Sequence, residues 1–387
     1  MGFEHDVVVV GLGGIGSAAA YWLARRGVDV VGLEQFDLGH ERGASHDHSR
    51  IVRLSYHTPG YVRMAAQAYH AWAALEDDAG ERLLVRTGGL DLGPVEGAIP
   101  LEDYERSMEA CGVAFERLDA REIMRRWPQW RLDDDVRGLY QPDAGLVSPT
   151  RATAVHQDLA RRHGAVLREN TPVVGLRASG AEADVLTPDG TYRCRSVVLT
   201  VDAWANDLLA PLGVRLPLTI TQEQVTYFAP PSPDAFAPER FPIWIWMDVP
   251  CFYGFPAYGE AGPKVAEDVG GPEVTPSGRS FRPEPENLAR VRAFVRDHLP
   301  GAVGPEIASR TCLYALTPDR DFVIEAVPGH PNVFVALGAA HGFKFASLIG
   351  RILADLALDG RTDVEIEPFA IDRPVLTMAD PPRTFFT

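Results

Sequence analysis

Residues 6–16 read DVVVVGLGGIG, and residues 17–34 continue SAAAYWLARRGVDVVGLE. This pattern predicts a buried strand, a glycine turn, a helix over 17–26 and a second strand that ends in an acid. Gly11 permits the tight turn, Gly13 lets the backbone approach a pyrophosphate, and Gly16 lets the helix pack closely on the sheet. Glu34 follows Gly16 by 18 residues, where a carboxylate can accept hydrogen bonds from ribose hydroxyls.

The free N–H groups at the start of this helix would bind phosphates. The whole unit therefore predicts dinucleotide binding. The motif does not separate FAD from NAD, and a glycine-rich turn that binds nothing is the alternative.

Size and composition narrow the class of protein. A chain of 387 residues is long for one domain, so we expect two. The formal charge of −16 argues against nucleic acid or an anionic membrane as a partner, but allows an anionic substrate in a local basic pocket. The four cysteines have no CxxC spacing, so we expect free thiols and no metal site. The chain begins without a signal-like or membrane-spanning apolar run, so the expected location is cytoplasmic.

The pattern along the chain predicts a mixed α/β protein with two interleaved domains. A Rossmann-like cofactor domain is expected from residues 1–85, 146–214 and 318–375. A sheet-rich substrate domain is expected from residues 86–145 and 215–317. The predicted helices cover residues 59–77, 101–111, 119–127, 151–163, 287–298 and 344–358. The predicted strands cover residues 85–92, 138–145, 165–167, 173–178, 183–187, 197–201, 215–228, 243–255, 306–316, 322–325 and 333–337. Residues 229–242 and 259–285 are predicted as Pro-rich loops.

Two later stretches resemble parts of a site. Residues 333–350 form a strand, a glycine turn and a helix, with Lys344 at the helix start, where a cation is unfavourable for the helix dipole. Lys344 is either a solvated side chain or a cation held for an anionic group. Residues 311–325 contain Cys312, which on spacing alone is most simply a small buried residue.

Four segments together resemble one known family. They are GLGGIG at 11–16 with Glu34, SHDHSRIVR at 45–53, CLYALTPDRDFVIE at 312–325 and GAAHGFKF at 338–345. In order and spacing they are similar to the monomeric sarcosine oxidase family, which includes N-methyltryptophan oxidase and, more remotely, pipecolate and fructosyl-amino-acid oxidases. The resemblance covers nearly the whole chain. It implies FAD rather than NAD, and a monomer.

The resemblance also implies roles for single residues. Cys312 matches the cysteine that bonds to the flavin 8α-methyl group, which implies covalent FAD. Arg53 and Lys344 match the two cations that hold the substrate carboxylate. Lys264 matches a lysine implicated in activating oxygen, and a cation there would stabilise charge developing on it. The remaining expected catalytic residues are Tyr253, Arg50 and His46. The residues expected at the cofactor are Gly11, Gly13, Gly16, Glu34, Ser45, Arg50, Val173, Cys312, Gly338, Gly342, Phe343 and Lys344.

Plainer interpretations stay open for several of these residues. Tyr253 is also consistent with a core aromatic, and Arg50 and Arg53 with the covering of a helix face. We expect Trp244 and Trp246 to pack in a sheet, and we give the packed His341 no catalytic role.

The chain departs from the family at two positions. Asp268 stands four residues after Lys264, where sarcosine oxidases carry a histidine, so an anion is expected near the substrate amine. Asp202 stands in a strand-to-helix turn where the family usually has glycine, and Asp tolerates unusual backbone angles better than most residues. Both departures leave the oxidase chemistry in place but make the substrate an open question.

The implied reaction is the oxidation of a secondary or N-methylated amino acid. Net hydride transfer from the C–H beside the amine to flavin N5 gives an imine, and water hydrolyses it to an amine and an aldehyde. Dioxygen is reduced to hydrogen peroxide. The alternatives are an oxidase of a cyclic imino acid or larger natural-product amine, a flavin dehydrogenase with another acceptor, and a non-catalytic FAD-binding subunit.

Overall fold

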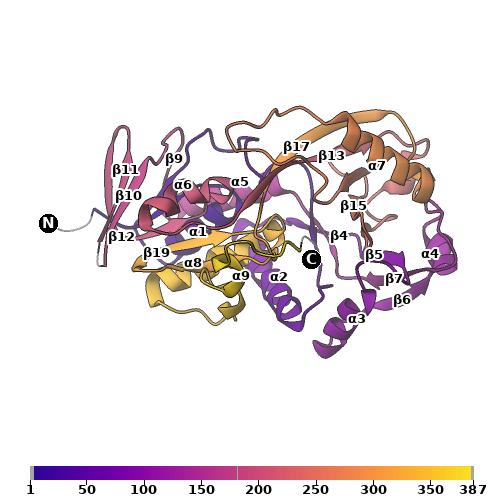
Figure 1. Cartoon of the computed structure of the whole chain (residues 1–387), viewed down its shortest axis with the longest axis horizontal. Helices are drawn as coiled ribbons and strands as arrows, with labels where there is room; N and C mark the ends of the chain where they lie inside the picture. Colours follow the sequence, from indigo (N-terminus) through magenta and orange to yellow (C-terminus); the bar gives the residue numbers. More distant parts are fainter. Residues whose placement is uncertain (1–3, 181, 385–387) are drawn as a thin grey trace.

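The computed structural model describes residues 4–180 and 182–384. Within these residues the strands form two eight-stranded sheets and one three-stranded sheet. The two large sheets lie toward opposite ends of the molecule, with β10 to β12 near one end and β6, β7 and α4 near the other (Figure 1). The predicted mixed α/β fold is confirmed.

The first large sheet has a parallel centre. Its five parallel strands run in the order β9-β2-β1-β12-β19, which is the order 3-2-1-4-5 along the chain and the arrangement typical of dinucleotide-binding folds. The β10–β11 hairpin and β18 add antiparallel strands. The strands are β1 (His5–Val10), β2 (Val30–Leu33), β9 (Val166–Arg168), β10 (Gly175–Ser179), β11 (Glu182–Thr187), β12 (Gly190–Leu199), β18 (Val323–Val327) and β19 (His330–Leu337).

Both faces of this sheet are covered. Successive side chains of a strand point to opposite faces, so Val7 and Val9 pack in one apolar cluster and Val8 and Val10 in another. The first cluster includes residues of α1 (Gly14–Arg25), α2 (Pro59–Ala79), α5 (Pro149–Arg162) and α8 (Ala346–Asp359). The second includes residues of the β10–β11 hairpin and of α6 (Ala205–Leu209). The run of buried residues in β1 follows from this double cover.

The second large sheet has the order β17-β13-β16-β15-β14-β5-β7-β6. Trp244 and Trp246 pack in its apolar core with Phe294, which confirms that they serve sheet packing. The strands are β5 (Gly89–Pro94), β6 (Glu116–Asp119), β7 (Val136–Gln141), β13 (Thr219–Phe228), β14 (Ile243–Trp246), β15 (Phe252–Phe255), β16 (Lys264–Glu267) and β17 (Glu306–Leu316). The helices between them are α3 (Leu101–Ala110), α4 (Ala120–Arg126) and α7 (Pro285–His298).

Several predicted elements need correction. Residues 243–255 form the antiparallel hairpin β14–β15 instead of one strand, because Pro250 between them has no N–H for a ladder. The predicted loop 259–285 contains the buried strand β16, which the surrounding Pro and Gly residues conceal. Residues 85–92 divide between two sheets, because Gly88 turns the chain with a φ of 71°. The predicted helix 344–358 starts as the 3-10 turn Gly342–Phe345 before α8.

The three-stranded sheet contains β3 (Arg50–Val52), β4 (Leu84–Arg86) and β8 (Gly145–Val147). Near the C-terminal end the short helix α9 (Pro374–Thr377) follows the last strands. Segments of the chain alternate between the two large sheets, and the exact domain boundaries stay a prediction. None of the helices in residues 4–180 and 182–384 combines the length and the apolar character that crossing a membrane requires.

Candidate active site

The glycine turn lies between β1 and α1. Gly11 has a φ of +86°, and a Cβ there would lie 2.7 Å from the Thr200 carbonyl oxygen. A Cβ on Gly16 would lie only 1.8 Å from the Gly11 carbonyl oxygen, so the first turn of α1 sits directly on the strand end. Helix α1 begins at Gly14, three residues earlier than predicted, because Ser17 N already donates to the Gly13 carbonyl over 2.9 Å.

A second segment closes over this turn. Ser45 Oγ accepts a hydrogen bond from Gly14 N at 2.9 Å, and a Cβ on Gly13 would lie 3.2 Å from the same oxygen. Phe343 lies so close that a Cβ on Gly14 would be 2.5 Å from its ring. Gly13, Gly14, Ser45 and Phe343 all line one cavity. The glycines therefore keep open a cradle that side chains would fill.

Glu34 comes directly after β2. Its Oε2 accepts from Leu12 N at 2.8 Å and its Oε1 from Phe36 N at 3.1 Å. The side chain is buried and lines the same cavity. The carboxylate thus lies beside the glycine turn, as a ribose-binding acid requires.

The cavity has a volume of about 300 Å³ and extends from the glycine turn to the second large sheet. It is the space in which a long cofactor and a small substrate would meet. Of the residues predicted for the site, those that line it are Gly11, Gly13, Glu34, Ser45, Arg50, Arg53, Val173, Tyr253, Gly338, Gly342, Phe343 and Lys344. Gly16, His46, Lys264 and Cys312 are not among its lining residues.

Arg53 and Lys344 lie close together in the wall of this cavity. The Arg53 guanidinium and the Lys344 Nζ are 5.1 and 5.6 Å from the centre of the Tyr56 ring. Arg53 Nη1 donates to Asp91 Oδ1 at 2.9 Å, while its buried Nε has no hydrogen-bond partner in the described part of the chain. Burial disfavours the charge of Arg53, but Asp91, Tyr56 and Tyr104 together outweigh this effect and raise its pKa. Burial, followed by repulsion from Arg53 and Arg320, holds the pKa of Lys344 well below its usual range.

Asp268 also lines the cavity, but it is not an isolated anion. Arg320 Nη1 and Nη2 donate to its two carboxylate oxygens at 2.7 and 3.0 Å. The side chain of Arg320 is only 2% exposed, so this is a bidentate pair in a buried wall. The expected anion beside the substrate amine is therefore matched by a cation that the sequence analysis missed.

His46 and Cys312 line a small neighbouring cavity. Arg50, Tyr253 and Tyr314 line both cavities and so lie between the two spaces. Burial raises the pKa of the Cys312 thiol to about 11, although Arg50 acts to lower it. Burial and then Arg50 lower the pKa of His46 to about 4, and neither of its ring nitrogens has a hydrogen-bond partner among the described residues. All four cysteines are free thiols.

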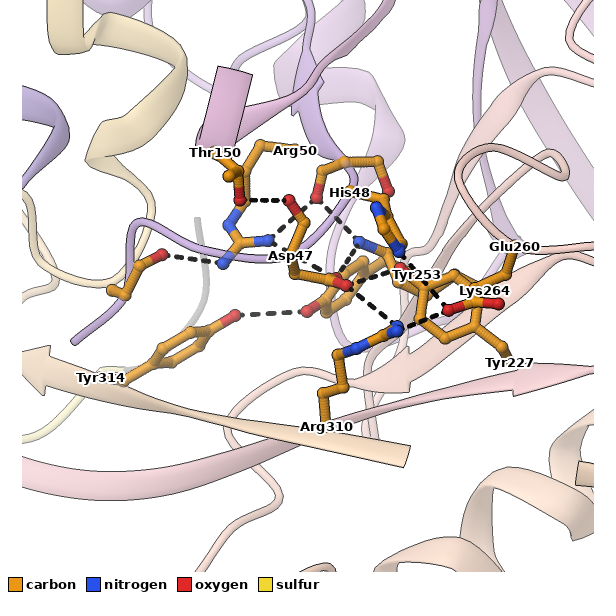
Figure 2. A network of polar contacts seen from close by, with 12 residues as sticks. Asp47, His48, Arg50, Thr150, Tyr227, Tyr253, Glu260, Lys264, Arg310 and Tyr314 are labelled. Carbon is orange, nitrogen blue, oxygen red and sulfur yellow. Dashed lines mark hydrogen bonds and ion pairs between the residues drawn. The ribbon is translucent and has the colours of Figure 1, made fainter. Parts of the chain in front are cut away.

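Lys264 belongs to a buried polar network (Figure 2). Its Nζ donates to Asp47 Oδ2 at 3.0 Å and to the Ser49 carbonyl at 2.7 Å. The same Nζ lies 4.1 Å from the centre of the Phe255 ring, and Phe255 lines the large cavity. Lys264 is thus behind a wall residue of the cavity. Burial lowers its pKa to about 8, against the opposing effect of Asp47.

Three other residues discussed in the sequence analysis, Tyr253, Asp202 and His341, lie in or beside the cavity wall. Tyr253 Oη lies 3.4 Å from Tyr314 Oη, and both rings face the cavity. Asp202 has a left-handed φ of 45° at the wall of the cavity, a conformation that glycine, the residue expected here from the family resemblance, adopts without strain. Burial raises the pKa of Asp202 to about 7. His341 is packed, and its Nε2 donates to the Arg320 carbonyl at 2.9 Å.

The sequence analysis did not single out Asp47, Asp91, Tyr314 or Arg320. Three of them stand inside or beside segments that it quoted, namely Asp47 in 45–53 and Tyr314 and Arg320 in 312–325. Their charged or hydroxyl-bearing side chains, inside segments already assigned to the site, were the signal that could have identified them. Asp91 lies in an apolar strand that carried none.

The geometry fits FAD, because one cavity is lined by a glycine cradle at a helix N-terminus, by an acid placed to bind ribose and by two cations. A family described as FAD dependent oxidoreductase (DAO) matches residues 6–356. Monomeric sarcosine oxidase of Streptomyces avermitilis is 37% identical, over 92% of this chain and 94% of the relative. N-methyl-L-tryptophan oxidase of Escherichia coli O157:H7 is 32% identical, over 96% and 99%. The solved structure of NikD, an unusual amino acid oxidase essential for nikkomycin biosynthesis, has a TM-score of 0.85 at 31% identity and covers 95% of this chain and 98% of its own. The chain therefore belongs to the DAO family of FAD-dependent oxidoreductases.

Proposed function

We propose that this protein oxidises a secondary or N-methylated amino acid and uses dioxygen as the electron acceptor. The reaction removes two electrons and two protons from the C–H and N–H of the amine, and dioxygen takes them up as hydrogen peroxide. Water then hydrolyses the imine, which releases formaldehyde when the oxidised carbon is an N-methyl group. Bound FAD supplies the redox chemistry. The protein binds and orients the amino acid and excludes water from it.

The pair Arg53 and Lys344 is the observation that carries this proposal. Both cations lie beside the Tyr56 ring in the wall of the cavity, and Arg53 has a buried donor without a partner among the described residues. A carboxylate is the group that satisfies a guanidinium fork and an ammonium together. Its attachment there restrains the substrate, so that the amine faces the cofactor space that begins at Gly338 and Gly342.

The use of lysine in this chain supports functional roles for both lysines. Of the 37 Lys and Arg residues, Lys264 and Lys344 are the only lysines, so the other 35 are arginines. Both lysines lie in or directly behind the cavity wall. An arginine stays charged in proteins, whereas a buried lysine changes its proton affinity with its surroundings. We infer that these two positions require an amine.

We further propose that FAD is bonded to the protein through Cys312. The thiol is free and buried, and Arg50 favours its thiolate form. Arg50, Tyr253 and Tyr314 line both its cavity and the large one. The family resemblance also supports a monomer, the cofactor-binding residues named above, and catalytic contributions from Arg50, His46, Tyr253 and Lys264.

The visible spectrum of the purified protein, before and after acid precipitation, tests the cofactor. A yellow pellet supports a covalent bond to Cys312, and a yellow supernatant refutes that bond while keeping FAD. A colourless protein from flavin-replete cells would refute the proposed oxidase.

Anaerobic mixing with sarcosine, N-methyl amino acids and cyclic imino acids then tests the substrate. Bleaching by an N-methyl amino acid, with peroxide and formaldehyde formed in air, is the expected result. Bleaching only by a cyclic imino acid, without formaldehyde, would favour the alternative substrate class. Bleaching without peroxide in air would indicate a dehydrogenase.

A further inference from the structure

Asp47 is the residue on which the network around Lys264 converges (Figure 2). Its Oδ2 accepts from Lys264 Nζ at 3.0 Å, and its Oδ1 accepts from Tyr227 Oη at 2.8 Å. Arg310 Nη1 lies 3.4 Å from the same Oδ1. The side chains of Asp47 and Lys264 are 3% and 1% exposed, so this ion pair is closed to solvent.

The backbone brings Asp47 to this position in an unusual conformation. Its φ is 82°, in the left-handed region that few residues other than glycine adopt. Its carbonyl accepts from Thr150 Oγ1 at 3.0 Å, which ties the residue to the start of α5. The chain therefore presents a carboxylate at a point where glycine would relieve the strain. Such a departure from the favoured residue points to a use for the carboxylate.

A buried lysine without a counter-ion loses its proton, because burial disfavours the charged form. Asp47 opposes this effect, and hydrogen bonds and ion pairs from several elements keep Asp47 itself ionised. The titratable and charged groups that face Lys264 are Asp47 and Arg50 near β3, Tyr227 on β13, and Arg310 and Cys312 on β17.

We propose that Asp47 is a positioning residue that holds Lys264 as an ammonium ion behind the cavity wall, ready to stabilise the negative charge that develops on dioxygen. This inference rests on the proposed function, in which dioxygen reoxidises the enzyme. Lys264 Nζ lies 4.1 Å from the centre of the ring of Phe255, which lines the cavity, and solvent screens a buried charge little over such a short distance. Asp47 acts through Lys264 and is not itself among the residues that line the large cavity, although its Oδ2 lies 3.9 Å from Nη1 of the lining residue Arg50.

The first test measures the protonation state of Lys264 directly and does not require the enzyme to turn over. Labelling with isotopic lysine gives two side-chain signals, because the chain has only two lysines. The variant Lys344→Arg leaves the Lys264 signal alone and so assigns it. In the native protein we expect its chemical shift to titrate near pH 8, because burial lowers the pKa of Lys264 to about 8. In Asp47→Asn the midpoint should fall by about 1–3 pH units, the usual effect of losing an opposite charge at this distance. An unchanged midpoint would overturn the proposal.

The second test separates the two halves of the reaction. In Asp47→Asn, anaerobic reduction by substrate should stay near the native rate, while reoxidation by dioxygen at pH 8 should fall at least about fivefold, since the ammonium fraction falls from about a half to below about a tenth. The rate should recover as the pH is lowered. Tyr227→Phe removes a hydrogen bond to Asp47 but no charge, so its pH profile should keep the native midpoint.

A double variant distinguishes positioning from general damage. In a Lys264→Met background, Asp47→Asn should cause no further loss of reoxidation rate, because its effect passes through Lys264. Multiplicative losses would show that Asp47 acts by another route. If no amine reduces the enzyme, the proposed function fails, but the titration of the labelled lysine still decides the Asp47–Lys264 coupling.

Discussion

The Arg320–Asp268 pair offers a prediction whose size follows from the structure. Arg320 holds both oxygens of Asp268 at 2.7 and 3.0 Å, and the side chains are 2% and 17% exposed. Removing one partner of a buried ion pair leaves the other charge uncompensated, which costs about 3–5 kcal/mol. Asp268 keeps some contact with the cavity, so we expect the lower end, about 3 kcal/mol, for Arg320→Met.

This loss translates into a measurable shift in melting temperature. With an unfolding entropy of about 2.1 cal/mol/K per residue, the 387 residues give about 0.8 kcal/mol/K. Arg320→Met should therefore lower Tm by about 4 °C. The double variant Arg320→Met/Asp268→Leu replaces the pair by apolar groups and should recover most of this loss. The reason is that the attraction within a buried ion pair does little more than offset the cost of removing both charges from water.

Thermal unfolding of the native protein, both single variants and the double variant is the assay. The two singles and the double define a coupling energy, which is about 5 kcal/mol if each single variant loses about 3 kcal/mol and the double variant about 1 kcal/mol. Additive losses, with no recovery in the double variant, would refute the argument that the two charges serve mainly to neutralise each other. Intact Tm values in the singles would refute it as well.

Three further predictions concern other residues of the site and His156, a buried residue of α5 that hydrogen-bonds to Ser347 Oγ at 3.2 Å. Lys344→Met should raise KM for an amino acid substrate about ten- to a hundredfold in steady-state assays, the effect of losing one hydrogen bond to a charged group; a fall in kcat at constant KM would contradict a carboxylate-binding role. Cys312→Ser should release all yellow colour into the supernatant on acid precipitation, and colour retained in the pellet would show attachment elsewhere. Burial lowers the pKa of His46 to about 4 and that of His156 to about 3. Between pH 6.5 and 4 these histidines therefore bind protons in the unfolded chain but not in the folded chain. The free energy of unfolding should fall as the pH falls through this window. His156→Gln should flatten that decline in melting curves, and an unchanged slope would show that other groups cause it.

The sequence predicted best what depends on neighbours along the chain. The strand, glycine turn and helix of residues 6–34 are local features, and the structure contains them with a shift of three residues at the helix start. The hairpin at 243–255 was missed because a continuous apolar run does not reveal where a strand reverses. Strand β16 was missed because only four residues carry it between Pro- and Gly-rich segments.

Partners far apart in the chain could not be read from the sequence. Asp268 was recognised as an anion near the substrate, but Arg320, 52 positions away, neutralises it. Lys264 was assigned near the cofactor, yet its hydrogen-bond partner Asp47 is 217 positions away. Such pairs follow from the order of strands in the sheets and from loop paths, and neither leaves a periodic pattern in the sequence.

These pairings define what the cavity will accept. Near Lys344, Asp91 balances Arg53 and Asp268 balances Arg320, each through a hydrogen-bonded ion pair. Lys344 has no ion pair within residues 4–180 and 182–384, so a ligand with one negative charge completes the balance around it. An amino acid carboxylate supplies that charge, and its amine is then best tolerated uncharged, which is the form that gives up electrons most readily. A second carboxylate close to Lys344 would compete with Asp91 for Arg53 or with Asp268 for Arg320. We therefore expect the cavity to favour amino acids with neutral side chains.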